Sequence, residues 1–486
     1  MSQRGVIGGA SVQWQLLIRP YDIGFGILVA ASVFLLIGFL KFVVFQVVPS
    51  LEGTAGMLNF HDAGIFQASA LELADAVRVE GWSVWSLNYE GQPIVGILGG
   101  LYAVLESAFF VWGGLQALIY GTGAIFLCTV FRKLDFGTSY GAAALYVALF
   151  MPTAAIIYLM PHNDLFIFIG YAMFVYGWWV IAQGAGANRG SVVCAVKFAL
   201  GVLAVLVGAG VAQVFREFTA DMFTAISIGM GLLVFVVVAA RWLRQAEGFS
   251  VVALPVVSVL LGILLIGGVH EPADFDLATR PAPPATPYQA VSMTSFADGM
   301  SDSKSGEVKE FQWKKTGWLP QFVDERFEQL AIARYRVITL EGHARSAIDH
   351  DVVYSSVTDV LAYVPRAMQL SMLSPFPSIW LPDNRAPLSR NVQRVLAGIE
   401  MLIVYSALPG LIYAIWTLRR CLALWCLIIP ATGWLLVYGL AVPVVGSLVR
   451  FRFPAFVTVT ALGFLGVILA MRAWQTRRNC GTSNLG

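Results

Sequence analysis

The chain has 486 residues, of which 58% are hydrophobic and 12% are charged. Soluble globular proteins contain about 45–50% apolar and about 25% charged residues, so an aqueous fold of this length cannot bury this much apolar surface and lipid must solvate much of it. The net charge of +2 gives no indication of nucleic-acid binding, and the sequence has no zinc-type Cys/His spacing, Walker loop or Rossmann fingerprint.

The first apolar run covers roughly residues 23–48. It is too long for the hydrophobic region of a signal peptide, and no small-x-small cleavage motif follows it, so we interpret it as a retained helix. About 20 apolar residues cross a bilayer. By this measure the sequence predicts an all-α polytopic membrane protein with about ten transmembrane helices, at roughly 24–47, 109–131, 138–159, 163–183, 192–214, 221–240, 249–269, 397–417, 421–442 and 454–472.

Two shorter helices are predicted between the first and second spans. The segment HDAGIFQASALELADAVRVE, which starts at His61, has a single apolar stripe at helical spacing. Pro93 then begins an apolar stretch of about 12 residues, too short to cross a bilayer. We expect both helices to lie at the membrane surface.

A long polar segment, residues 271–395, separates the seventh and eighth spans. Its first part, up to Lys309, is rich in Pro, Ser and Gly and is typical of a linker or a disordered segment. From Phe311 the composition is globular, with amphipathic helices expected at 324–336 and 355–373, the second broken near Pro365. We expect the stretch around Trp380 to lie in the headgroup layer. The predicted units are therefore a membrane module at 1–270, a mixed soluble loop domain at 271–395 and a second membrane module at 396–486.

Every alternate loop is basic, which places both termini in the cytoplasm and the long loop on the outer side. The residues that set this pattern are Arg4, Arg19, Arg132, Lys133, Arg189, Arg241, Arg244, Arg419, Arg420, Arg472, Arg477 and Arg478. The five cysteines fall on the cytoplasmic side, so no structural disulfide is expected. They are Cys128, Cys194, Cys421, Cys426 and Cys480.

Polar residues gather at the predicted outer face. Acidic positions beside several arginines suit an anionic lipid head group, because Arg binds phosphate in bidentate fashion and a carboxylate can act as a general base. Each residue also has a purely structural interpretation: Asp62 as a helix cap, His162–Asp164 as a polar turn, the late arginines as interfacial residues and Arg216 as part of a loop ion pair. The group comprises His61, Asp62, His162, Asn163, Asp164, Arg216, Glu217, Asp221, Arg366, Arg385, Arg390, Arg450 and Arg452.

Three motifs in this order resemble the GT-C superfamily of membrane glycosyltransferases, to which protein O-mannosyltransferases and the aminoarabinose transferase of lipid A belong. HDAGIFQASALELA is similar to the acid and surface helix that follow the family's first span. YLMPHNDLFIFIGYAMF places Asp164 at a second acidic position, and GSLVRFRFPAFVTVTALGFLGV is similar to an Arg-aromatic-Arg-x-Pro start of a late helix. His61 replaces the second acid that often precedes the first, and no DxD is present.

The resemblance implies an inverting transferase in a bacterial inner membrane, which moves a sugar from a polyprenyl-phosphate-linked donor to an envelope glycan, lipid or protein. Asp62 would be the catalytic base and Asp164 would support it, by binding the acceptor or a divalent metal. Arg450 and Arg452 would hold the donor phosphate, and the long loop would select the acceptor. The other predicted substrate-binding residues are His61, His162, Asn163 and Arg366.

Three alternatives stay open. An O-antigen-type polymerase or ligase also has many helices and a large outer loop, but does not need the acid and surface helix after the first span. A transporter of lipid-linked glycans usually carries ionisable residues and broken helices at the midplane, and neither is clear here. A non-catalytic subunit of a polysaccharide export machine would not need Asp62 or the arginines.

Overall fold

The computed structural model describes residues 18–52, 61–105, 108–134, 139–152, 161–184, 192–216, 219–245, 311–341, 346–382 and 388–482. In these ranges every named element is helical, and one isolated β-bridge pairs Ala347 with Val444. The predicted class, an all-α polytopic membrane protein, is confirmed.

Seven helices in this part of the chain are long and apolar enough to cross a membrane. The first comprises α1 (Pro20–Phe39), a π-helical turn (Leu40–Val44) and α2 (Phe45–Val47) in direct succession. The others are α5 (Ala108–Phe131), α8 (Asp164–Gly184), α9 (Val192–Phe215), α15 (Leu388–Leu418), α16 (Leu422–Ala441) and α18 (Phe453–Thr482). Each contains one of the ten predicted spans.

The remaining three predicted spans are not among these seven helices. Helix α6 (Tyr140–Leu149) covers the first half of the third, and much of the rest of that span falls outside the described residues. Helix α10 (Thr219–Gln245) covers the whole of the sixth. The seventh span, 249–269, lies entirely outside the described ranges.

Small residues allow α8 and α9 to pack closely. A Cβ atom added at Gly170 would lie 2.6 Å from the carbonyl oxygen of Gly208, and one added at Gly208 would lie 2.5 Å from that of Gly170. At a second close contact between the same helices, a Cβ atom added at Gly177 would lie 2.6 Å from the carbonyl oxygen of Gly201. Close backbone approach of this kind supplies packing energy where lipid removes the hydrophobic drive between helices.

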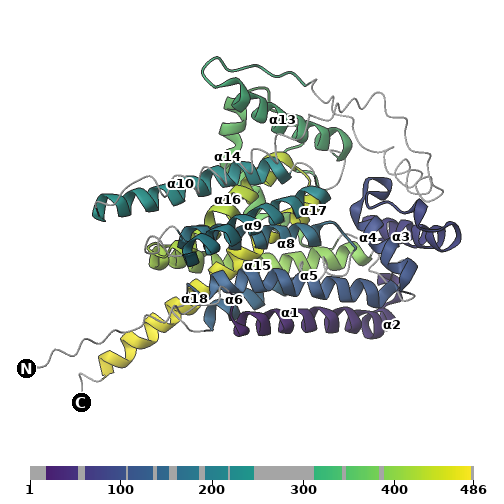
Figure 1. Ribbon diagram of the computed structural model, residues 1–486, viewed down its shortest axis with the longest axis horizontal. Helices are drawn as coiled ribbons and strands as arrows, with labels where there is room; N and C mark the ends of the chain where they lie inside the picture. The colour runs from purple at the N-terminus through teal and green to yellow at the C-terminus, as the bar shows by residue number, and fades with distance from the viewer. Residues whose placement is uncertain are drawn as a thin grey trace, which may run out of the picture.

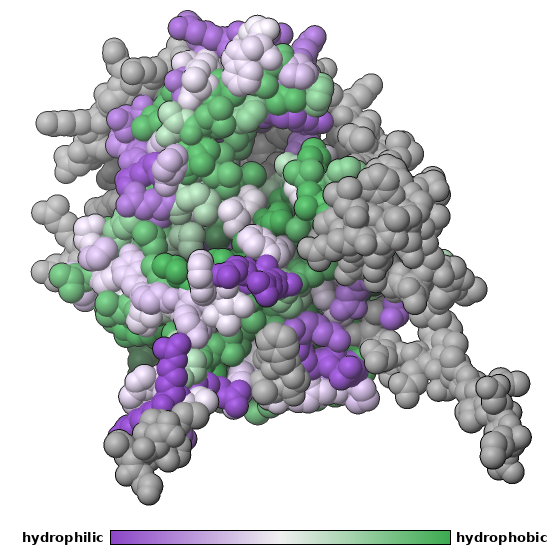
Figure 2. Space-filling view, turned by 90° about the vertical axis from the view of Figure 1, so that its left-hand side faces the viewer, coloured by the Kyte–Doolittle hydropathy of each residue, from purple (hydrophilic) through white to green (hydrophobic). Residues whose placement is uncertain are grey.

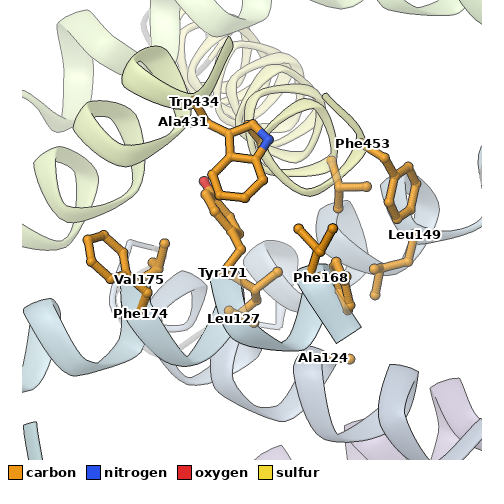
Figure 3. Packing of buried hydrophobic residues seen from close by; sticks show 14 of the residues in the cluster. Ala124, Leu127, Leu149, Phe168, Tyr171, Phe174, Val175, Ala431, Trp434 and Phe453 are labelled. Carbon is orange, nitrogen blue, oxygen red and sulfur yellow. The ribbon is translucent and has the colours of Figure 1, made fainter. Parts of the chain in front are cut away.

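Aromatic side chains fill the centre of the bundle (Figure 3). Tyr171 on α8 points toward Trp434 on α16, with ring centroids 5.3 Å apart in an edge-to-face arrangement. Phe168 stacks on Tyr120 of α5 at 4.5 Å. These contacts join α5, α8 and α16 into one core, and such aromatic pairs stabilise beyond the area they bury.

Two short helices pack on each other at one end of the bundle, opposite the end where α18 finishes (Figure 1). They are α3 (His61–Glu80) and α4 (Pro93–Val104), so the two helices predicted after the first span are present. Ala70, Leu73 and Val77 are buried along α3, as the apolar stripe predicts.

The segment 311–382, here called the α13–α14 unit, contains helices α13 (Gln321–Glu341) and α14 (Val357–Leu373) beside α10 and α16. Both predicted amphipathic helices are present, but the predicted break near Pro365 is wrong, because α14 continues through it. The burial of Val360, Ala367 and Leu370 outweighs the one backbone hydrogen bond that a proline removes.

The surface has the character expected of lipid-facing spans. Large apolar side chains are exposed along α1, α10 and α15, including Leu35, Leu232 and Ile412. The space-filling view looks onto the end of the bundle that lies at the left of Figure 1; there hydrophilic residues gather at the top, at the height of α13, and separate hydrophilic groups interrupt apolar and neutral surface below (Figure 2).

Candidate functional site

A polar cavity of about 290 Å³ lies at the α3–α4 end of the bundle. It forms where the first turns of α8, the last turn of α9, the helix α17 (Val445–Phe451) and the α3–α4 pair meet. We call it the arginine cavity. Its lining residues are Phe66, Gly91, Gln92, His162, Asn163, Asp164, Phe215, Arg216 and Arg450.

Asp164 is the central charge of the arginine cavity. It is the first residue of α8, is only 5% exposed, and accepts a hydrogen bond of 2.9 Å from Nη2 of Arg216. Nε of Arg450 lies 3.9 Å from its other carboxylate oxygen. A carboxylate in the first turn of a helix also interacts favourably with the helix dipole. Among the described lining residues, the two arginines exceed the one aspartate by one positive charge when His162 is neutral.

His162 connects this charge cluster to α3. Its Nε2 atom lies 3.2 Å from Nη1 of Arg450, with a donor and acceptor assignment that depends on the histidine tautomer. Its ring meets Phe66 edge-on, with centroids 5.4 Å apart. His162 is 5% exposed, so this predicted substrate-binding residue is enclosed within the cavity wall.

Asn163 links the start of α8 to the start of α4 through hydrogen bonds. Its Nδ2 donates to the side chain of Gln92 at 3.0 Å, and its Oδ1 accepts from the backbone N–H of Ile94 at 3.2 Å. That N–H lies in the first turn of α4, where no intrahelical acceptor exists. Asn163 therefore positions α4 against the cavity as well as lining it.

Asp62 and His61 begin α3, and their side chains lie outside the described part of the structure. Position 62 precedes Phe66 by four residues, so both positions are on the same face of α3, one turn apart. Because Phe66 lines the arginine cavity, this face of α3 is directed toward the cavity.

Arg216 belongs to the polar group noted in the sequence, but it was not among the predicted catalytic or substrate-binding residues. Its guanidinium lies 3.7 Å from the ring centroid of Phe451 on α17, in addition to its bond with Asp164. The only available signal was an arginine just after the end of a span on the side where basic residues are uncommon. The sequence predicted that Arg216 forms a loop ion pair with its neighbours Glu217 and Asp221. Glu217 is outside the described residues, and Asp221 pairs with Arg326 at 2.7 Å.

Arg452 does not reach the arginine cavity. It is 1% exposed and donates to the backbone oxygen of Ser371 at 2.7 Å. Positions 450 and 452 are two residues apart in helical conformation, which rotates their side chains by about 200° about the axis. Glu400, which had no predicted role, acts electrostatically on Arg452 and is itself buried.

Arg366 is also placed elsewhere, in the α13–α14 unit. Its Nε donates to Asp349 at 2.8 Å. Burial raises the pKa of Asp349, but hydrogen bonds from Arg366 and Tyr363 outweigh it and hold that pKa below its usual value. Arg366 is not among the residues that line the arginine cavity, so the structure gives no support to its predicted role in substrate binding.

In the ranges that the structure describes, no three His, Cys, Asp or Glu side chains come together in a way that suits a metal ion. Asp164 is the one carboxylate among the described residues that line the cavity, and two guanidinium groups lie within 4 Å of it. A divalent cation beside Asp164 would face their repulsion, whereas an anion would be attracted.

The fold defines the chain as a multi-pass α-helical membrane protein with a polar, arginine-lined cavity at one end of its helices. No family model, curated protein or solved structure matches the chain.

Proposed function

We propose that the protein is a glycosyltransferase of the GT-C type. It would move a sugar from a polyprenyl-phosphate-linked donor to an envelope glycan, lipid or protein at the outer face of a bacterial inner membrane. The observation that carries this proposal is the arginine cavity, in which Arg216 and Arg450 flank Asp164 at the ends of membrane-spanning helices.

The charges and donors of the cavity favour a phosphate. Arg216 and Arg450 provide planar guanidinium groups, which pair with phosphate oxygens through charge-assisted hydrogen bonds. The described lining residues carry two guanidinium groups against one carboxylate, and the N-termini of α8 and α4 both direct their first turns at this region. These groups would attract a bound phosphate.

The position of the cavity suits a substrate that is held by a lipid. It adjoins the first turn of α8 and the last turn of α9, the ends that the charge pattern predicts to be outer, so a headgroup could enter while its isoprenoid chain stays in the bilayer. Its volume of about 290 Å³ is close to the lower limit of about 300 Å³ for small-molecule pockets, which suits a headgroup rather than a whole lipid.

The chemical step would fall to Asp62 and Asp164. Asp62 would accept the proton of the acceptor hydroxyl, and Phe66 on the same face of α3 already lines the cavity. Asp164 is held between two arginines and would orient them toward the phosphate leaving group rather than take up a proton itself. Stabilising the charge that develops on that phosphate is the largest contribution expected of such a site.

The test is binding of a polyprenyl monophosphate to the purified full-length protein in lipid nanodiscs. Arg450→Ala should weaken binding roughly tenfold or more, equivalent to about 1.4 kcal/mol or more, and Arg450→Lys should recover only part because Lys lacks the planar fork. Arg366→Ala is the matched control, since this arginine pairs with Asp349 away from the cavity. Unchanged affinity in Arg450→Ala, or an equal loss in Arg366→Ala, would contradict the donor-site assignment.

A further inference from the structure

An ion pair holds α13 at the end of α10. Nη1 of Arg326 lies 2.7 Å from Oδ1 of Asp221. Asp221 is the acidic residue in the first turn of α10, directly before the apolar run that starts at Met222, so it lies at the level where that helix would meet the lipid headgroups. Arg326 is therefore fixed at the membrane boundary.

Two large aromatic side chains are exposed next to this point. Phe322 precedes Arg326 by one helical turn on the same face of α13, and it is 69% exposed. Trp318 precedes it in the chain and is also 69% exposed. The opposite face of α13 is buried through Asp324, Ala331 and Ile338, so the α13–α14 unit has a complete interior without these two rings.

Lysines accompany the exposed rings. Lys314 and Lys315 are both exposed, and the backbone N–H of Lys314 donates to the carbonyl oxygen of Ser355 at 2.8 Å, which ties this segment to the start of α14. By contrast, the neighbouring Trp313 donates its indole N–H to Asp324 at 3.0 Å. Of the two tryptophans in this stretch, only Trp318 is directed outward.

We propose that residues 314–326 form a membrane-surface anchor, in which Trp318 and Phe322 enter the headgroup layer and Lys314 and Lys315 bind anionic phospholipids. Aromatic rings at the level of the headgroups, with lysines beside them, are the composition that favours a bilayer interface. Each lysine close to an anionic surface adds about 1 kcal/mol of attraction. The anchor would set the height of the α13–α14 unit above the bilayer, and it does not depend on the proposed transferase activity.

The anchor can be tested in the full-length protein, with the native cysteines replaced and a single cysteine carrying an environment-sensitive fluorophore. We expect a label at Phe322→Cys in nanodiscs to be quenched by lipids with a nitroxide near the headgroup and shielded from aqueous iodide. A label at Asp351→Cys, an exposed polar position of the same unit, should show the reverse.

The charge contribution has its own comparison. Lys314→Glu with Lys315→Glu should reduce lipid quenching of a label at Trp318→Cys in nanodiscs containing phosphatidylglycerol, and much less in phosphatidylcholine alone. Equal lipid quenching at positions 322 and 351 would overturn the anchor. Shielding of position 322 from iodide without lipid quenching would also overturn it, because a protein partner would then cover this face.

Discussion

At the scale of single residues, two neighbouring arginines make it possible for the carboxylate of Asp164 to be buried. An unpaired carboxylate that is 5% exposed would be strongly destabilising, and Arg216 and Arg450 supply the compensating charge. Both arginines also contact Phe451, at 3.7 and 5.6 Å from its ring centroid. One aromatic residue of α17 thus fixes the spacing of two guanidinium groups, and such preorganisation is what a phosphate site requires.

Asp62 provides the sharpest residue-level prediction. Asp62→Asn should leave the protein folded, with a melting temperature in detergent close to that of the wild type, because Asn serves the start of a helix about as well as Asp. It should lower sugar transfer by roughly 100-fold or more, because an amide cannot act as the general base. Transfer is measured at equal membrane abundance, with binding of polyprenyl monophosphate measured in parallel.

Binding of polyprenyl monophosphate shows whether Asp62→Asn loses the chemical step or the donor site. Lost transfer with retained binding supports the assigned base, whereas full transfer in Asp62→Asn would leave only the helix-start role. Asp164→Asn is the comparison, and its transfer should fall less if Asp164 orients the arginines.

The sequence could predict which residues gather at one end of the molecule, but not which of them face the cavity. Membrane topology alone brings His162, Asp164 and Arg450 to the same side, because alternate loops share a face. The rotation that turns Arg452 away from Arg450 depends on the local helix α17, which is too short to give a periodic pattern. Arg216 was missed because its partners are 52 residues or more away in the chain.

At the scale of elements, the α13–α14 unit is joined to the segment that leads into α17. The backbone N–H of Ile348 donates to Pro443 at 2.9 Å, and that of Val445 donates to Ser346 at 3.0 Å. Arg334 is fully buried and donates to the carbonyl oxygen of Leu440 at 3.2 Å, near the end of α16. Because α17 carries Arg450, this joint also fixes one wall of the arginine cavity.

Replacing Arg334 tests the joint. Arg334→Met should cost about 1.5–3 kcal/mol per charged hydrogen bond lost at a buried carbonyl, so the melting temperature should fall by several degrees. Protease should cut the α13–α14 unit faster, and phosphate binding should weaken because α17 loses its support. The control is Arg326→Met, whose exposed ion pair with Asp221 contributes about 0–1 kcal/mol. Equal melting temperatures for the two variants would contradict the joint.

Hydropathy located the helices well and their ends less well. Helix α18 runs to Thr482, although its predicted span stops at 472, and α15 begins at Leu388 rather than near 397. A hydropathy window detects only the part of a helix that lipid surrounds, while backbone hydrogen bonds continue into the polar turns beyond it. The apolar stripe of α3 was readable because its polar face is well separated from its buried face.

At the scale of the whole molecule, the two ends of the bundle differ in chemistry. The α3–α4 end carries the arginine cavity, and the opposite end carries the last turns of α18 (Figure 1). The α13–α14 unit contacts the first turn of α10 and the last turn of α16. At the α18 end Arg132 forms a bidentate pair with Asp22, at 2.8 Å for each bond, and Asp22 is fully buried. Lys133 follows directly, and its amine lies 5.9 Å from the ring centroid of Trp179. By the positive-inside rule, the basic residues at this end predict that it faces the cytoplasm.

The orientation can be measured with a membrane-impermeant maleimide on right-side-out vesicles. A cysteine at Asp351, in the α13–α14 unit, should be labelled, and one at Gln475, near the end of α18, should be labelled only after detergent is added. Both positions are exposed in the folded protein, so a difference in labelling reports the side of the membrane rather than burial. All five native cysteines are replaced so that they give no background labelling. Labelling of Gln475→Cys in intact vesicles, with Asp351→Cys protected, would reverse the orientation and move the arginine cavity to the cytoplasmic face, where the proposed outer-face transfer could not occur.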